Sequence, residues 1–166
     1  MYDRFSSSPS SRDALKAAAP EERLPLLLRM AAAQRELGAV DLAARVLDEA
    51  EKLAKDPRSK ADLAVDRGRL AQHQGDLAGA EAAYKKAFGL YQGAGDPRGG
   101  ANAALNLGTA RILLGRVDEA DKAFAGAKTL YASLGDARGQ ADADVNLALV
   151  ARQRGRLRRE FSHRSR

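Results

Sequence analysis

Apolar residues recur every three or four positions in seven stretches of the chain, and short polar turns separate these stretches. Residues 98–114 show the pattern clearly, with small or apolar side chains at 101, 104, 105, 108 and 112. This spacing places them on one face of a helix. The same periodicity predicts helices at roughly 20–37, 41–55, 58–74, 77–93, 98–114, 117–134 and 137–154.

The helical stretches belong to an internal repeat. Residues 95–108 and 135–148 are identical at eight of fourteen positions and lie 40 residues apart. Gly75, Gly115 and Gly155 keep the same 40-residue spacing, and Gly38 marks a shorter earlier copy. A fixed period of this length is typical of arrays of stacked structural units.

The turns carry residues that begin and end helices. Asp56 and Asp96 suit the N-cap, because a carboxylate accepts hydrogen bonds from the first helical N–H groups. Each is followed by a proline, which fits the first helical position because no N–H is needed there. Gly95 and Gly135 precede such caps and suit the left-handed residue that ends a helix. Each repeat is therefore predicted to be a pair of helices.

Helices joined by such short turns form antiparallel hairpins, and no hairpin buries its apolar face alone. We therefore predict an all-α fold: a right-handed α-solenoid of about 3.5 hairpin repeats with a concave inner face. Residues 1–18 are expected to be a flexible or partly helical lead-in, residues 19–155 the repeat domain, and residues 156–166 a basic C-terminal tail.

The repeat resembles the tetratricopeptide repeat. The family motif, a Leu-Gly followed by a turn Gly, Ala, an aromatic residue and Ala, reads here as Leu107-Gly108, Gly115, Ala120, Phe124 and Ala127. A second copy offers Gly68, Gly75, Ala80, Tyr84 and Ala87, and a first copy Gly38, Ala43, Leu47 and Ala50. The period exceeds the family's usual ~34 residues. It is similar to the longer-helix variety found in adaptor and regulatory proteins.

The resemblance implies a binding site on the first helix of each repeat, which lines the concave face in the family. An Asn before the Leu-Gly often hydrogen-bonds the backbone of a bound peptide there, and this position holds Asn106 and Asn146, with Asp66 and Arg29 in the other copies. The full set of candidate groove residues is Arg29, Asp66, Arg69, Asn102, Asn106, Thr109, Asn146 and Arg152. The alternative is that the two Asn residues only cap or bridge neighbouring helices.

The positive charge of the chain lies at its C-terminal end. Residues 152–166 contain seven Arg and one Glu, and removing them from the 28 basic and 22 acidic residues leaves 21 of each. The folded body is therefore neutral, which argues against nucleic-acid binding by the repeats themselves.

No catalytic motif is recognisable in the sequence. The chain has no Cys and two His, and contains no nucleotide-binding, zinc-protease or serine-hydrolase motif. The Gly-rich run at 93–100 follows a predicted helix rather than a strand, so we interpret it as a helix end followed by an N-cap. We expect neither an enzyme nor a cofactor, and, without a recognisable signal peptide or membrane span, a cytoplasmic protein.

Two functions remain open. The first is a protein-interaction scaffold that binds a peptide or helix of a partner in the concave groove. The second is a tail that binds nucleic acid or an anionic membrane electrostatically, with the repeats as a dimerisation body. The last predicted helix has no partner helix. We expect the tail, a second chain through self-association, or a further part of a longer array to cover it.

Overall fold

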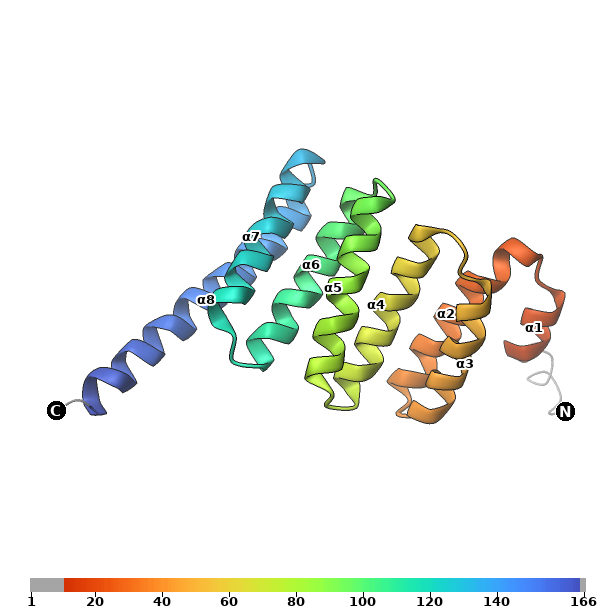
Figure 1. The fold of residues 1–166 in the computed structure, drawn as a ribbon, viewed down its shortest axis with the longest axis horizontal. Coiled ribbons are helices and arrows are strands. Elements are labelled where there is room, and N and C mark those ends of the chain that lie inside the picture. The colour runs from red at the N-terminus through yellow and green to blue at the C-terminus, as the bar shows by residue number, and fades with distance from the viewer. Residues whose placement is uncertain (1–10, 165–166) are drawn as a thin grey trace, which may run out of the picture. The chain divides into compact units, whose positions relative to one another are not determined.

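The computed structural model describes residues 11–164. Eight helices and no strand occur in this range (Figure 1). Their bounds are α1 (Ser11–Ala17), α2 (Pro20–Glu36), α3 (Val40–Leu53), α4 (Pro57–His73), α5 (Leu77–Gly93), α6 (Pro97–Leu113), α7 (Val117–Ser133) and α8 (Ala137–Arg164). The predicted all-α repeat architecture is confirmed. Six of the seven predicted helices agree with the structure to within two residues at both ends.

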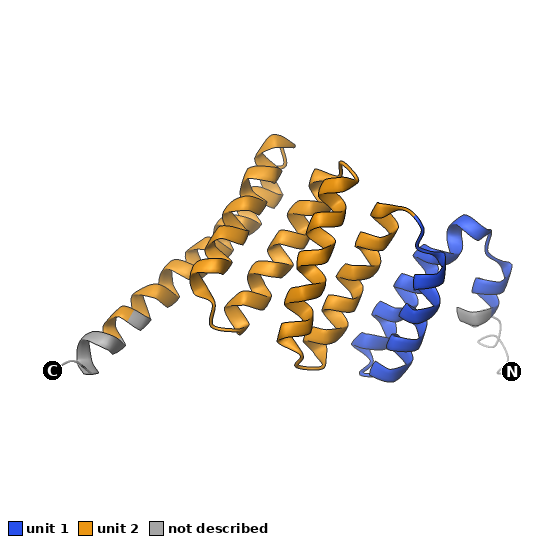
Figure 2. Ribbon diagram, viewed as in Figure 1, with its two compact units in different colours: residues 1–55 blue, residues 56–166 orange. Residues whose placement is uncertain are grey.

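The chain divides into two compact units, residues 1–55 and residues 56–166 (Figure 2). Unit 1 contains the hairpin of α2 and α3, with the short helix α1 beside α2. Ala43, Leu47 and Ala50, which the repeat pattern predicts as core positions, are buried on α3. Leu27 and Ala31 of α2 complete this small core.

Unit 2 contains two hairpins, α4 with α5 and α6 with α7, followed by α8 (Figure 1). The first helix of each repeat is called an A helix here (α4, α6 and α8), and the second a B helix (α5 and α7). Consecutive helices pack against each other, so α6 contacts both α5 and α7, whereas α8 packs against α7. The core of unit 2 lies between these neighbouring helices.

Glycines of the A helices lie directly against aromatic rings of the B helices. A Cβ atom on Gly68 would lie 2.6 Å from the ring of Tyr84, and one on Gly108 would lie 2.5 Å from the ring of Phe124. Real Cβ atoms do not approach other atoms so closely. The Gly of the Leu-Gly motif is therefore required by the packing of each hairpin.

The predicted caps are confirmed. The Asp56 carboxylate accepts a hydrogen bond from the Ser59 N–H, and the Asp96 carboxylate accepts one from the Gly99 N–H, each at 2.9 Å. Gly95 and Gly135 both have a φ of 65°, a left-handed conformation that favours glycine. These contacts explain why the turn sequence recurs in each repeat.

The predicted end of the last helix is wrong, because α8 continues ten residues beyond position 154 to Arg164. Gly155 holds the repeat position of Gly75 and Gly115, which have φ values of 81° and 76°, but Gly155 lies inside the helix without a positive φ. At the earlier positions the chain turns so that a B helix packs back. No later segment of the described chain packs back onto α8, and the Arg and Leu residues after Gly155 favour continued helix. The last two residues of the predicted tail lie outside the described range.

Candidate functional site: the polar face of the A helices

The A helices of unit 2 have one side that no B helix covers. On α6, Ala103, Leu107 and Ala110 pack toward α5, and Ala101 and Ala104 pack toward α7. The remaining side is mostly polar and recurs at 40-residue intervals. We call it the polar face, and it consists of Arg58, Asp62, Asp66 and Arg69 on α4, Arg98, Asn102, Asn106 and Thr109 on α6, and Arg138, Asp142, Asn146 and Leu149 on α8.

Two residues of the polar face are held by tyrosines of the B helices. The Tyr91 hydroxyl donates to the Asp62 carboxylate at 2.5 Å, and the Tyr131 hydroxyl donates to the Asn102 side-chain oxygen at 2.6 Å. Burial raises the pKa of Tyr91, and its hydrogen bond to Asp62 raises the pKa further. The predicted groove residue Asn102 therefore has a structural role within its own hairpin, although its side chain is exposed.

The predicted Asn positions differ from each other in their hydrogen bonding. The Asn146 amide donates to the Asp142 backbone oxygen at 2.9 Å, one turn earlier in α8. The Asn106 side chain is half-buried and has no hydrogen-bond partner among the residues that the structure describes. Asn106 therefore retains both its donor and its acceptor, whereas the Asn146 amide already donates within its own helix and neither caps nor bridges a neighbouring one.

Three other predicted residues of the polar face also make local contacts. The Arg69 guanidinium lies 3.2 Å from the Asp66 carboxylate within α4. The Thr109 hydroxyl donates to the Leu105 backbone oxygen at 3.0 Å within α6. The Arg69 and Thr109 side chains remain exposed, so these contacts leave the face accessible from solvent.

Ion pairs link the N-terminal ends of successive A helices. The Arg58 guanidinium lies 3.4 Å from the Asp96 carboxylate, and Arg98 makes the equivalent pair with Asp136. The Gly139 N–H and the Arg98 guanidinium together lower the pKa of Asp136 below its ordinary value. The recurring Asp-x-Arg sequence therefore both caps one helix and connects it to the next.

The other two predicted site residues do not share this face. Arg29 is exposed on α2 and belongs to unit 1, whereas the polar face belongs to unit 2. Arg152 is exposed on α8, where it holds the repeat position of Ile112. Ile112 packs toward α7 on a different side of its helix from Asn106. The structure thus brings together six of the eight predicted residues, on α4, α6 and α8.

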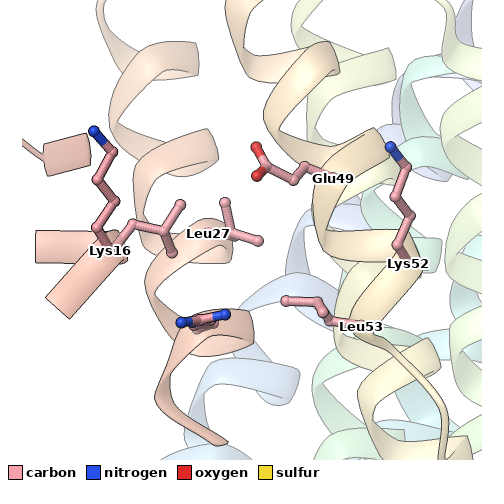
Figure 3. A pocket seen from close by; sticks show the side chains of 7 residues that line it. Lys16, Leu27, Glu49, Lys52 and Leu53 are labelled. Atoms are coloured by element: carbon pink, nitrogen blue, oxygen red, sulfur yellow. The ribbon is translucent and has the colours of Figure 1, made fainter. Parts of the chain in front are cut away.

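A pocket in unit 1 was not predicted from the sequence. It has a volume of about 460 Å³ and is lined by Leu15, Lys16, Arg23, Leu27, Glu49, Lys52 and Leu53 (Figure 3). Three leucines and three cations with a single acid suit a ligand that has an apolar body and an anionic end. No sequence motif marked it, because its residues come from three helices and Lys16 fell in the predicted lead-in.

The described residues offer no sign of metal chemistry or of a membrane span. No three His, Asp or Glu side chains among them gather as metal ligands would. Within residues 11–164, no helix combines the length and the hydropathy that crossing a bilayer requires.

Comparisons of the fold identify the architecture. The chain is similar to a signal transduction ATPase with a tetratricopeptide repeat sensor from Pyrococcus horikoshii, with 15% identity, a TM-score of 0.77, and coverage of 86% of this chain and 23% of that one. It is also similar to aspartyl phosphate phosphatase F from Bacillus subtilis (10% identity, TM-score 0.79, 94% and 42% covered). A third similar structure is the Rap conjugation gene regulator of plasmid pLS20 in complex with the Phr* peptide (18% identity, TM-score 0.68, 93% and 43% covered).

The chain has a tetratricopeptide-repeat-like fold. It spans less than half the length of these three proteins. No family model and no curated protein matches the sequence. The predicted resemblance to the tetratricopeptide repeat is confirmed at the level of the fold.

Proposed function

We propose that the chain is a non-catalytic protein-interaction scaffold that binds an extended peptide or a helix of a partner along the polar face of α4, α6 and α8. Two general observations support the proposal. The polar face repeats along three consecutive A helices, so it presents side chains at regular intervals to an elongated ligand. One protein of similar fold, the Rap regulator, was solved with a bound peptide.

The observation that carries the proposal is the side chain of Asn106. Its neighbours on the same face already form hydrogen bonds: Asn102 accepts one from Tyr131, and Thr109 donates one to the backbone of its own helix. The Asn106 amide is half-buried between them and has no partner among the described residues. An Asn amide both donates and accepts, so it pairs with a peptide unit whatever side chain that unit carries.

The test is a selection of peptides from a random displayed library on the wild-type protein, followed by affinity measurements on variants. Asn106→Ala should weaken the selected peptides at least about fivefold, the loss expected for one hydrogen bond of about 1 kcal/mol. Gln92→Ala removes an exposed amide at the end of α5 and serves as the matched control, with no expected change. Asn146→Ala should have a smaller effect than Asn106→Ala, because Asn146 already donates to its own helix.

Equal affinity for wild type and Asn106→Ala would remove the polar face as the binding site. Circular dichroism of each variant should match wild type, because none of the three amides lies in the core.

A second candidate is electrostatic binding by the C-terminal half of α8. Arg152, Arg156 and Arg158 are exposed there, whereas Arg154 is paired with Asp118 at 2.7 Å and Asp121 at 3.2 Å. Binding of duplex DNA that weakens steeply with salt and disappears when residues 156–166 are deleted would support this candidate. Salt-independent or unchanged binding would exclude it.

A further inference from the structure

One side of α8 carries apolar side chains that the structure leaves exposed. Val145 is 62% exposed and Leu149 is 45% exposed. Val65, at the repeat position of Val145 on α4, is 8% exposed because it packs with residues of α5. We call this side of α8 the outer face. It consists of Ala141, Asp144, Val145, Ala148, Leu149 and Arg152, and Leu149 lies at its border with the polar face.

The outer face is not built to receive another B helix of the repeat. Ala148 replaces the glycine that lies against the B-helix aromatic ring in both earlier hairpins, and a Cβ there would overlap such a ring. Asp144 holds the repeat position of Ala104, which is 4% exposed against α7. A regular B helix packed here would remove the Asp144 carboxylate from water, which is costly without a new partner.

The outer face is instead complementary to itself. Asp144 lies four residues before Ala148, and Arg152 lies four residues after it. If two copies of α8 cross antiparallel at Ala148, each Asp144 faces the Arg152 of the other copy. The wider charge distribution agrees, because the N-terminal half of the helix carries Asp142 and Asp144 with one exposed Arg, whereas four exposed Arg residues and no described exposed acid lie in the C-terminal half.

We infer that the outer face of α8 binds the same face of a second copy of this chain, with the two helices antiparallel and Ala148 on the twofold axis. Burial of Val145 and Leu149 provides the hydrophobic contribution. The small side chain of Ala148 permits close approach of the helices. Two symmetric Asp144–Arg152 pairs fix the direction and the register. Asp144 also lies 2.6 Å from the Lys128 ammonium in its own chain, but both side chains are about half exposed, so the carboxylate is accessible to a second cation.

Charge-reversal variants test this arrangement by sedimentation. The wild type should be a dimer at about 0.2 mM, and Asp144→Arg and Arg152→Asp should each weaken the dimer at least about tenfold, because like charges then face each other twice. A mixture of the two single variants should dimerise again, since both contacts of the mixed dimer then join an arginine of one chain to an aspartate of the other. Rescue by mixing would not follow from damage to the fold of either variant.

The matched control reverses a charge away from the outer face. Lys122 lies on the exposed surface of α7, and the variant Lys122→Asp should leave the dimer unchanged. A second readout uses the absence of native Cys. Ala148→Cys on the twofold axis should form a disulfide between the two chains under mild oxidation, whereas Ala125→Cys on α7 should form little such disulfide.

A monomeric wild type at this concentration would overturn the inference. A dimer that neither charge reversal weakens, or variants that do not recover on mixing, would also overturn it for this face. A wild type that stays monomeric but binds duplex DNA or anionic vesicles through residues 152–159 would assign the basic half of α8 to a polyanion instead. Peptide binding by the polar face is measured separately, so failure of one proposal leaves the other testable.

Discussion

Helices α6 and α8 share one sequence pattern but have different surroundings. Of the positions that they have in common, Gly99, Ala103 and Leu107 recur in α8 and face the preceding B helix. Two positions that face the following B helix have changed, since Gly108 and Ala104 are replaced by Ala148 and Asp144, whereas Ala101 is kept as Ala141. The glycine and the small apolar residue that admit a following B helix on α6 are therefore absent from α8, where no such helix packs among the described residues.

The largest difference in stability is expected when leucine is placed at the equivalent positions 108 and 148. Gly108→Leu should lower the free energy of unfolding by about 3 kcal/mol, because its side chain overlaps the ring of Phe124. Ala148→Leu should change it by less than about 0.5 kcal/mol, because no B helix covers that position. Urea unfolding of dilute protein, followed by circular dichroism, measures both. Similar losses in the two variants would contradict the comparison.

Much of the fold could be predicted from the sequence, and the part that could not has a physical cause. The caps, turns and core positions follow from local rules, since Asp96 and Gly95 act within one turn. The extension of α8 was missed because the turn at Gly155 depends on a helix packing back, which local sequence does not reveal.

The site was predicted less completely than the fold. Periodicity placed Asn102 and Asn106 on the same face. It did not show that the Tyr131 hydroxyl hydrogen-bonds Asn102 and not Asn106. Tyr91 and Asp62 are 29 residues apart in the sequence, and so are Tyr131 and Asn102. This repeated separation is the signal that could have revealed both pairs. The unit 1 pocket depends on side chains from three helices and has no such repeated signal.

The two complete hairpins of unit 2 also differ in a polar pair. The Tyr84 hydroxyl donates to the Gln72 side-chain oxygen at 3.1 Å, whereas Phe124 and Ile112 hold the same positions in the next hairpin. Tyr84→Phe should cost about 1 kcal/mol, because the half-buried Gln72 loses its donor. Tyr84→Phe combined with Gln72→Ile should recover to within about 0.5 kcal/mol of wild type. Strictly additive losses in a double-mutant cycle would show that the two residues are not coupled.

A smaller effect is expected at the caps. The pKa of Asp136 lies below 3.8 in the folded protein, because the Gly139 N–H and Arg98 favour the charged carboxylate. The lowered pKa stabilises the folded protein at pH values above the pKa that Asp136 has in the unfolded chain. This contribution is lost as the pH falls through the pKa of the folded state. Arg98→Gln should raise the pKa of Asp136, while Arg138→Gln, one repeat later, should not. Carboxyl ¹³C NMR titration distinguishes them, and an unchanged pKa in Arg98→Gln would exclude the pair.

Equivalent positions of the repeat are covered on α4 and uncovered on α8, as Val65 and Val145 show most clearly. Val65→Cys and Val145→Cys introduce single thiols at these positions into a chain without Cys, and their alkylation rates can be compared in dilute, monomeric protein. The thiol at 145 should react more than about tenfold faster than the thiol at 65, which reacts only after local opening. Comparable rates at the two positions would contradict this difference in exposure.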